Sequence, residues 1–241
     1  MLRRKSLTGS NEIHAALPKA HDEDVYTIRA AASSYAKAFH SHNAVADDFI
    51  SLGQSSRSID QRAACIEALI SVWPERPELA SIGLGAKSTE IPLLQTLGLL
   101  VGARLGKVSQ EDAVDALELA TDRIGGSVPY QWSDLLGPLL LEVGKIHPSM
   151  IKLACLYAVQ ENVWSSQRSD VGIDRATAWF VLVNSYAKDA DVISLVAKEM
   201  EKEYPFLSIH HPNIWKFIAS NYRGVEEIER ASDARIVRFN V

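Results

Sequence analysis

One short segment carries residue types that could bind a nucleotide. Residues 83–88 read GLGAKS, and glycines let backbone amides wrap a phosphate while a lysine neutralises its charge. The phosphate-binding loop requires a glycine directly before its lysine and a buried strand leading into it. Here Ala86 precedes Lys87, and the residues before them have a helical pattern. The segment therefore predicts a glycine turn that ends a helix, with Lys87 in solvent.

A second group of side chains has the atoms that bind metal ions. His40 and His42 precede Asp47 and Asp48 in the sequence. On a helix, residues two positions apart point about 200° away from each other, so the two imidazoles share one ion only if the helix frays there. The spacing does not match that of a zinc hydrolase. We expect neither a metal nor a cofactor.

The acidic residues, serines and cysteines do not form a recognisable catalytic pattern either. The acidic pairs at 111–112 and 226–227 stand in predicted first turns of helices, where the helix dipole favours negative charge. No serine or cysteine lies in the context of a nucleophile elbow. We therefore expect no enzymatic activity. The alternative is an enzyme with an unrecognised arrangement of histidines and carboxylates.

Two aromatic residues are candidate interaction anchors. Tyr130 and Trp132 follow a glycine pair at 125–126 in a predicted loop, and aromatic side chains on a turn can anchor a partner. The alternative is that they fold over the end of the hydrophobic core. The tryptophans expected inside the core are Trp73, Trp164, Trp179 and Trp215.

The composition excludes several classes of protein. The chain of 241 residues is 47% hydrophobic and 23% charged, which is ordinary for a globular protein, and its net charge is -5. The most apolar segment, 97–103, is too short to span a bilayer, so no membrane is expected as a partner. Cys65 and Cys155 lie far apart within apolar helical patterns, which indicates buried, reduced thiols and a cytoplasmic location.

Apolar residues recur at intervals of three and four along the chain, which predicts an all-α fold. We expect 1–20 to be a flexible N-terminal arm and 21–241 to be a single helical repeat domain, with a candidate joint at 164–173. The predicted helices are 21–39, 44–52, 58–73, 77–82, 89–105, 110–124, 133–143, 148–159, 174–187, 191–204, 212–222 and 225–234, before an extended segment at 236–241. The glycines predicted to end or interrupt helices are Gly53, Gly83, Gly85, Gly106, Gly137 and Gly144.

One buried-face pattern occurs more than once. The stripe that begins at Ala63 recurs 113 positions later, and a partial copy follows about 36 positions after that. The aligned residues are Ala63, Ile66, Leu69, Ile70 and Trp73, then Ala176, Trp179, Leu182, Val183 and Tyr186, then Trp215, Ile218, Ala219 and Tyr222. The predicted hairpin turns follow Trp73, Leu105, Val143, Tyr186 and Tyr222. This spacing predicts a right-handed α-solenoid of antiparallel helix pairs, and the alternative is an irregular helical bundle.

The segment 62–82, which reads RAACIEALISVWPERPELASI, resembles a HEAT-type repeat. The segment 175–197 is similar, but it has Tyr186 and Ala187 where the first copy has Trp-Pro. Both are similar to the divergent repeats that follow the nucleotide-binding core of bacterial STAND/NACHT-type proteins. The resemblance implies a sensing or scaffolding solenoid with no catalytic residues to transfer.

The function expected from the sequence is a non-catalytic protein–protein interaction module that binds a protein partner or a second copy of itself. The alternative is a nucleic-acid-binding solenoid with a basic concave surface. The net charge of -5 opposes it, because a phosphate-binding surface needs a concentration of cations. The residues that would have to form that surface are Arg57, Arg62, Arg104, Lys107, Arg123, Lys145, Lys152, Arg168 and Arg175.

Overall fold

The computed structural model describes residues 25–121, 128, 130–160, 173, 175–202 and 220–239. Every regular element within these residues is helical, which confirms the all-α prediction. The helices are α2 (Val25–Ala38), α3 (Asn43–Ser55), α4 (Ile59–Val72), α5 (Glu78–Lys87), α6 (Pro92–Arg104), α7 (Gln110–Thr121), the 3₁₀ helix η1 (Tyr130–Leu135), α8 (Leu136–Ile146), α9 (Pro148–Gln160), α10 (Arg175–Ser185), α11 (Ala190–Met200) and α14 (Glu226–Phe239). The predicted arm and nearly all of the candidate joint lie outside the described residues.

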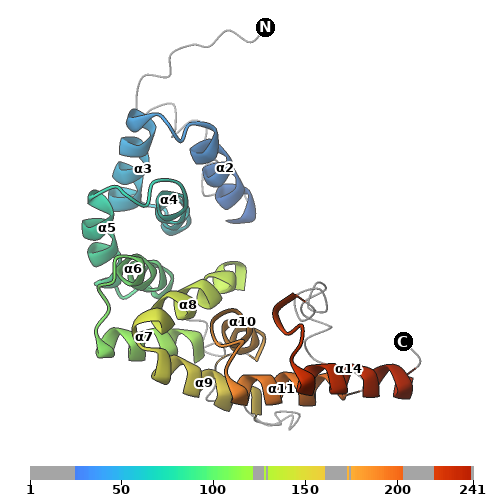
Figure 1. Ribbon diagram of the computed structural model, residues 1–241. Coiled ribbons are helices and arrows are strands. Elements are labelled where there is room, and N and C mark those ends of the chain that lie inside the picture. Colours follow the sequence, from blue (N-terminus) through green and yellow to red (C-terminus); the bar gives the residue numbers. More distant parts are fainter. Residues whose placement is uncertain are drawn as a thin grey trace, which may run out of the picture.

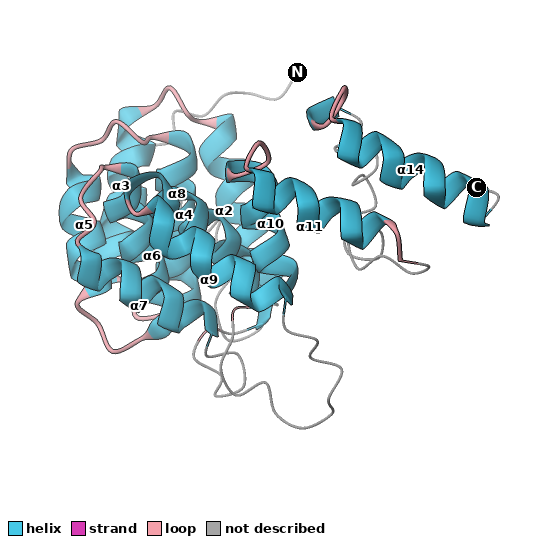
Figure 2. Cartoon of the chain, turned by 60° about the horizontal axis from the view of Figure 1, so that its bottom comes forward, coloured by secondary structure: helices cyan, strands magenta, loops and turns pink. Residues whose placement is uncertain are grey.

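The helices are arranged in two layers along an arc (Figure 1). The inner layer consists of α2, α4, α6, α8 and α10, and each of these contacts the next one in this series. The outer layer consists of α3, α5, α7 and α9, which follow the outer side of the arc. At the C-terminal end, α11 packs against α14, and Figure 2 shows this pair away from α3 and α5.

Local signals in the sequence set several helix ends. The Ser58 side chain accepts a hydrogen bond from the Gln61 amide (3.3 Å), which confirms the predicted cap of α4. Ser109 and Asp112 form a reciprocal capping box at the start of α7, with distances of 3.0 and 3.1 Å. Gly106 ends the α6 segment in the left-handed conformation, with φ at 68°.

Several glycines do not break helices as predicted. Gly53 lies inside α3, and both Gly83 and Gly85 lie inside α5, which continues to Lys87. Gly53 and Gly83 are tolerated because they face a neighbouring helix at short range: a Cβ at Gly83 would lie 2.5 Å from the Val101 side chain. The interruption expected at 137–138 is also wrong, since these residues stand in the first turn of α8, where a proline needs no amide partner. The segment predicted as extended at the C-terminus is helical through Phe239.

The described residues of the repeated stripe are buried, with one exception. All five members of its first copy are buried, and in the second copy only Ala176 is half-buried. Of the third copy, only Tyr222 falls within the described residues, and it is buried. The pairing of helices differs from the predicted hairpins, however, because the most extensive packing joins α5 to α6 and α3 to α4. These two pairs meet at the α3–α4 and α5–α6 turns, which lie one helix away from the turns of the predicted hairpins.

One kind of hydrogen bond recurs near the turns. In each case, a polar side-chain atom approaches a backbone carbonyl oxygen at an earlier turn or helix end, and the two residues are separated by 33 to 39 positions. We call these four the turn-edge contacts. They join Trp73 Nε1 to His40 O (2.6 Å), Arg104 Nη1 to Ile70 O (3.0 Å), His147 Nε2 to Val108 O (3.0 Å) and Tyr186 Oη to Pro148 O (3.1 Å).

The closest helix contact gives a stability test with an internal control. A Cβ at Gly98 would lie 2.4 Å from the Lys87 backbone nitrogen and 2.6 Å from the Gly83 carbonyl oxygen, whereas a Cβ at Gly85 meets nothing within 4 Å. We expect Gly98→Ala to lower the free energy of unfolding by about 2–3 kcal/mol, because backbone must move aside. Gly85→Ala should raise it by about 0.5–1 kcal/mol through helix propensity. Urea unfolding followed by circular dichroism measures both, and equal effects would contradict the packing assigned to Gly98.

Candidate interaction surface

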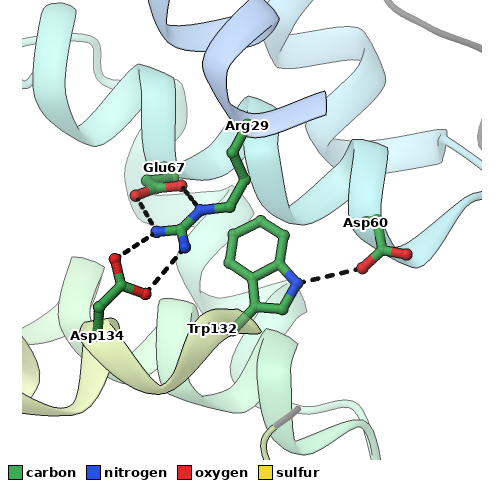
Figure 3. A network of polar contacts seen from close by, with 5 residues as sticks. All are labelled: Arg29, Asp60, Glu67, Trp132 and Asp134. Atoms are coloured by element: carbon green, nitrogen blue, oxygen red, sulfur yellow. Dashed lines mark hydrogen bonds and ion pairs between the residues drawn. The ribbon is translucent and has the colours of Figure 1, made fainter. Parts of the chain in front are cut away.

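The predicted anchor Trp132 lies inside the protein (Figure 3). Its ring is fully buried, its Nε1 donates a hydrogen bond to Asp60 Oδ1 (3.2 Å), and the Arg29 guanidinium carbon lies 4.3 Å from the ring centroid. The alternative arrangement, in which the aromatic residue folds onto the core, is therefore the one observed for this ring. The side chain of Tyr130 lies outside the described part of the structure.

Arg29 connects three helices through one guanidinium group. Its Nε and Nη2 atoms donate to both carboxylate oxygens of Glu67 (2.9 and 2.7 Å), and Nη1 and Nη2 donate to Asp134 (2.9 Å each). Burial lowers the pKa of Arg29, but the hydrogen bonds to the two carboxylates outweigh this effect and raise the pKa above its ordinary value. These paired bonds, together with the ring of Trp132, form the Arg29 clamp, which joins α2, α4 and η1.

This clamp has no direct signal in the sequence. Arg29 and Asp134 are 105 positions apart, and nothing in the local pattern around Arg29 distinguishes it from other arginines on helices. The one clue is the residue type of Trp132, because a buried indole needs a partner for its N–H group. Since the clamp satisfies its own charges, we assign it a structural role.

The residues of the candidate phosphate-binding and metal-binding segments have structural partners in the fold. Residues 83–88 form the C-terminal end of α5 and its cap, and Lys87 is ion-paired with the buried Asp112 instead of lying free in solvent. His40 lies in the α2–α3 turn, with its Nδ1 3.1 Å from the Lys37 carbonyl oxygen, and Asp47 is ion-paired with Arg76. Within the described ranges, no three histidine, cysteine or acidic side chains are placed to share a metal ion.

An apolar groove runs between α5 and α6. It has a volume of about 340 Å³, and its lining includes Ala80, Leu84, Lys87, Gly98, Leu105 and Lys107. Leu84 is 70% exposed and Leu105 is 39% exposed, although both are large apolar side chains. A smaller hollow shares Leu105 with the groove and extends toward Pro74 and Arg104. We call the first of these the α5–α6 groove.

Three glycines form part of the lining of this groove. At Gly98 the backbones of α5 and α6 are in direct contact, because a Cβ there would lie 2.4 Å from the Lys87 nitrogen and 2.6 Å from the Gly83 carbonyl oxygen. Gly83, Gly98 and Gly102 contribute no side chains, so this part of the lining is backbone alone. Leu84 and Leu105 line the same groove and remain exposed. Burying one leucine is worth about 1.5–3 kcal/mol, so the surface favours binding of an apolar ligand.

The charged side chains that line the α5–α6 groove and the adjoining hollow are basic, and two of them are ion-paired, Lys87 with Asp112 and Arg104 with Glu142. Among the described residues, the groove and the adjoining hollow are lined by Lys87, Lys107 and Arg104 and by no acidic side chain. Acidic residues lie beyond Lys87 instead, where a second groove of about 300 Å³ is lined by Asp115 and Glu118.

The ion pair between Lys87 and Asp112 lowers the pKa of the Asp112 carboxyl group. Burial raises the pKa of Asp112, but its hydrogen bonds with Lys87 and Ser109 outweigh this and hold the pKa below its usual range. The charge of Lys87 is thereby partly compensated within the protein. Lys107 has no such acidic partner in the described part of the chain, so the free positive charge of the groove lies at that end.

The cysteines, the hydropathy of the helices and the comparisons with known proteins do not assign this chain to a class of protein. Cys65 and Cys155 are unpaired and buried, and burial raises the pKa of each thiol to about 12, so both stay protonated at neutral pH. No described helix has the length and apolar character needed to cross a bilayer. Comparison with known protein families, with curated proteins and with solved structures finds no match.

Replacing Arg29 tests whether the clamp holds α2 in place. Arg29→Ala should lower the free energy of unfolding by about 2–3 kcal/mol, because it removes charge-assisted hydrogen bonds to two carboxylates. Arg29→Lys should recover little of this loss, since an ammonium group cannot form both bidentate pairs. Arg57, which is exposed, provides the control, and Arg57→Ala should change stability by less than about 0.5 kcal/mol. Similar losses for Arg29→Ala and Arg57→Ala in urea unfolding would contradict the clamp.

The Lys87–Asp112 pair predicts a dependence of stability on pH. The folded-state pKa of Asp112 is lower than the ordinary value of an aspartate, so its ionised form stabilises the fold above about pH 4, and this contribution is lost as the pH falls through the folded-state value. Asp112→Asn should therefore lower the unfolding free energy by about 1–2 kcal/mol at pH 7, with the gap to the wild type closing below about pH 4. Asp115→Asn removes the same charge from the same helix and serves as the control. A gap that stays constant between neutral and strongly acidic pH would contradict the assignment.

Proposed function

We propose that this chain is a non-catalytic protein–protein interaction module with a sensing or scaffolding role. The observation that carries the proposal is the α5–α6 groove, where Leu84 and Leu105 are exposed beside an unfilled apolar hollow. Folded proteins usually bind their ligands in hollows that are lined mainly by apolar side chains. The ion pairs and buried thiols described above provide no competing reactive centre.

We further propose that the module is a right-handed, HEAT-like α-solenoid, similar to the repeats of bacterial STAND/NACHT-type proteins. Support comes from the inner layer, in which each helix contacts the next member of the same layer, as expected when one helix pair stacks on another. The turn-edge contacts support the same interpretation, because each joins two residues 33 to 39 positions apart and this matches the length of a two-helix repeat. The cytoplasmic location stays a prediction that rests on the two unpaired cysteines.

The nucleic-acid alternative has less support. Several of the cations that would form its surface already have carboxylate partners within 4.0 Å: Arg104 with Glu142, Lys145 with Glu142, Lys152 with Asp189 and Asp191, and Arg175 with Glu199. A cation paired in this way contributes little to counterion release from a phosphate backbone.

Capture from the native host tests the proposed function. The full chain, immobilised as bait, should retain a protein that then forms a complex of fixed stoichiometry with it when both are purified and mixed. Size-exclusion chromatography with light scattering measures that stoichiometry, and a defined homo-oligomer of the chain would also satisfy the proposal. A chain that stays monomeric and retains no partner would contradict it. A metal or small molecule found by native mass spectrometry would favour the enzyme alternative instead.

A further inference from the structure

We infer that the α5–α6 groove binds an acidic amphipathic helix of a partner protein. This inference rests on the proposed function and specifies the site and the chemical class of its ligand.

The shape of the groove fits a helical ligand. Along α5 the lining extends from Ala80 to Lys87, which at 1.5 Å per residue is a length of about 10 Å. A ligand helix presents apolar side chains at positions i, i+3 or i+4, and i+7, and these cover the same length. The volume of about 340 Å³ lies at the lower end of the range of about 300–1,000 Å³ typical of ligand pockets. The groove can therefore receive one apolar face of about two helical turns.

The apolar contacts are concentrated on the two exposed leucines. Leu84 lies on α5, Leu105 stands at the C-terminal cap of α6, and Gly98 and Gly102 contribute only backbone to the lining. A leucine or aromatic side chain of the ligand would lie against the glycines and cover both leucines. Exposure alone does not distinguish this site, because Leu153 on α9 is 69% exposed, close to the 70% of Leu84, and lines none of these hollows. Leu153 therefore provides a matched control.

The charges indicate an acidic ligand. Lys107 lies at one end of the groove, and neither the groove nor the adjoining hollow has an acidic side chain in its described lining. Arg104 lines the adjoining hollow, but it is ion-paired with Glu142. Lys87 is paired with Asp112, so Lys107 is the residue best placed to attract a carboxylate of the ligand. Complementary charges of this kind select the partner and accelerate association, and their effect weakens with salt.

Selection from a random peptide library tests the inference while the partner is still unidentified. The full chain is used to select displayed peptides of about 16 residues, which are long enough for about four helical turns. Enriched peptides should carry apolar residues at i, i+3 or i+4, and i+7, have a net negative charge, and gain helical circular dichroism on binding. Fluorescence anisotropy then gives the dissociation constants of the labelled peptides. Leu84→Glu should weaken binding about tenfold or more, whereas Leu153→Glu should leave it unchanged.

A charge swap tests the role of Lys107 separately. Lys107→Glu should weaken binding of the selected acidic peptide, and it should strengthen binding of the same peptide with its glutamates replaced by lysines. Lys188 is also exposed but lies in the turn between α10 and α11, so Lys188→Glu makes the same change in net charge and should have little effect. All four variants change exposed side chains, and thermal melting followed by circular dichroism verifies that each is folded.

Each of the remaining outcomes overturns the inference. No enriched peptide, peptides that are basic or bind in an extended form, or binding that Leu84→Glu leaves intact would all reject an acidic helix in this groove. Dimerisation of the chain that Leu84→Glu abolishes would assign the groove to a second copy. If native partners bind the wild type and Leu84→Glu equally, the interaction function stands and only the groove is wrong. If nothing binds the chain in either experiment, both proposals fall.

Discussion

The enclosure of α6 is the constraint on which the rest of the array depends. Nine of its 13 residues are buried, and they lie on every side of the helix. A helix that is apolar all round must be surrounded by protein, and α6 accordingly contacts α4, α5, α7, α8 and η1. Its buried hydroxyl, on Thr96, is satisfied within the helix by a hydrogen bond to the Pro92 carbonyl oxygen (2.9 Å). Layers form on both sides of α6 because no single neighbour could cover it.

The turn-edge contacts show how one kind of contact can recur while the residues that form it differ. A backbone carbonyl oxygen has two lone pairs, so a side-chain donor of suitable reach can bind it whether or not it also accepts a helical hydrogen bond. Trp73, Arg104, His147 and Tyr186 each approach a carbonyl oxygen with a different chemical group. Since the hydrogen bond constrains position and not residue type, equivalent contacts can form between segments that share few identities. The copies of the buried stripe likewise match in the spacing of their apolar residues far better than in the residues themselves.

Features that depend on residues close together in the sequence are predicted correctly, and features that depend on distant residues are not. Helix starts such as Ser58 and Ser109 are predicted correctly because a cap depends on residues three positions apart. The glycines inside α3 and α5 are assigned wrongly, because the contact that favours a glycine at Gly83 comes from Val101 on another helix. The Arg29 clamp is not predicted at all, since its partners are 38 and 105 positions away. The α5–α6 groove is not predicted for the same reason. The only feature of the sequence that marks its position is a cluster of glycines, and this cluster predicts a turn.

Packing accounts for some residues of the α5–α6 groove and leaves others without a structural reason. Gly83 and Gly98 are required by the close approach of the two helices, and Gly102 accommodates the Lys107 carbonyl oxygen, which would lie 3.1 Å from a Cβ there. Leu84 has no comparable role, because its side chain is 70% exposed on a helix whose buried face is formed by other residues. A single exposed leucine is ordinary in a folded protein. Its position is informative here because Leu84 lines one groove together with these glycines and with the exposed Leu105, so that a ligand helix would bury both leucines. Packing thus accounts for the glycines of the groove, and it gives no reason for Leu84.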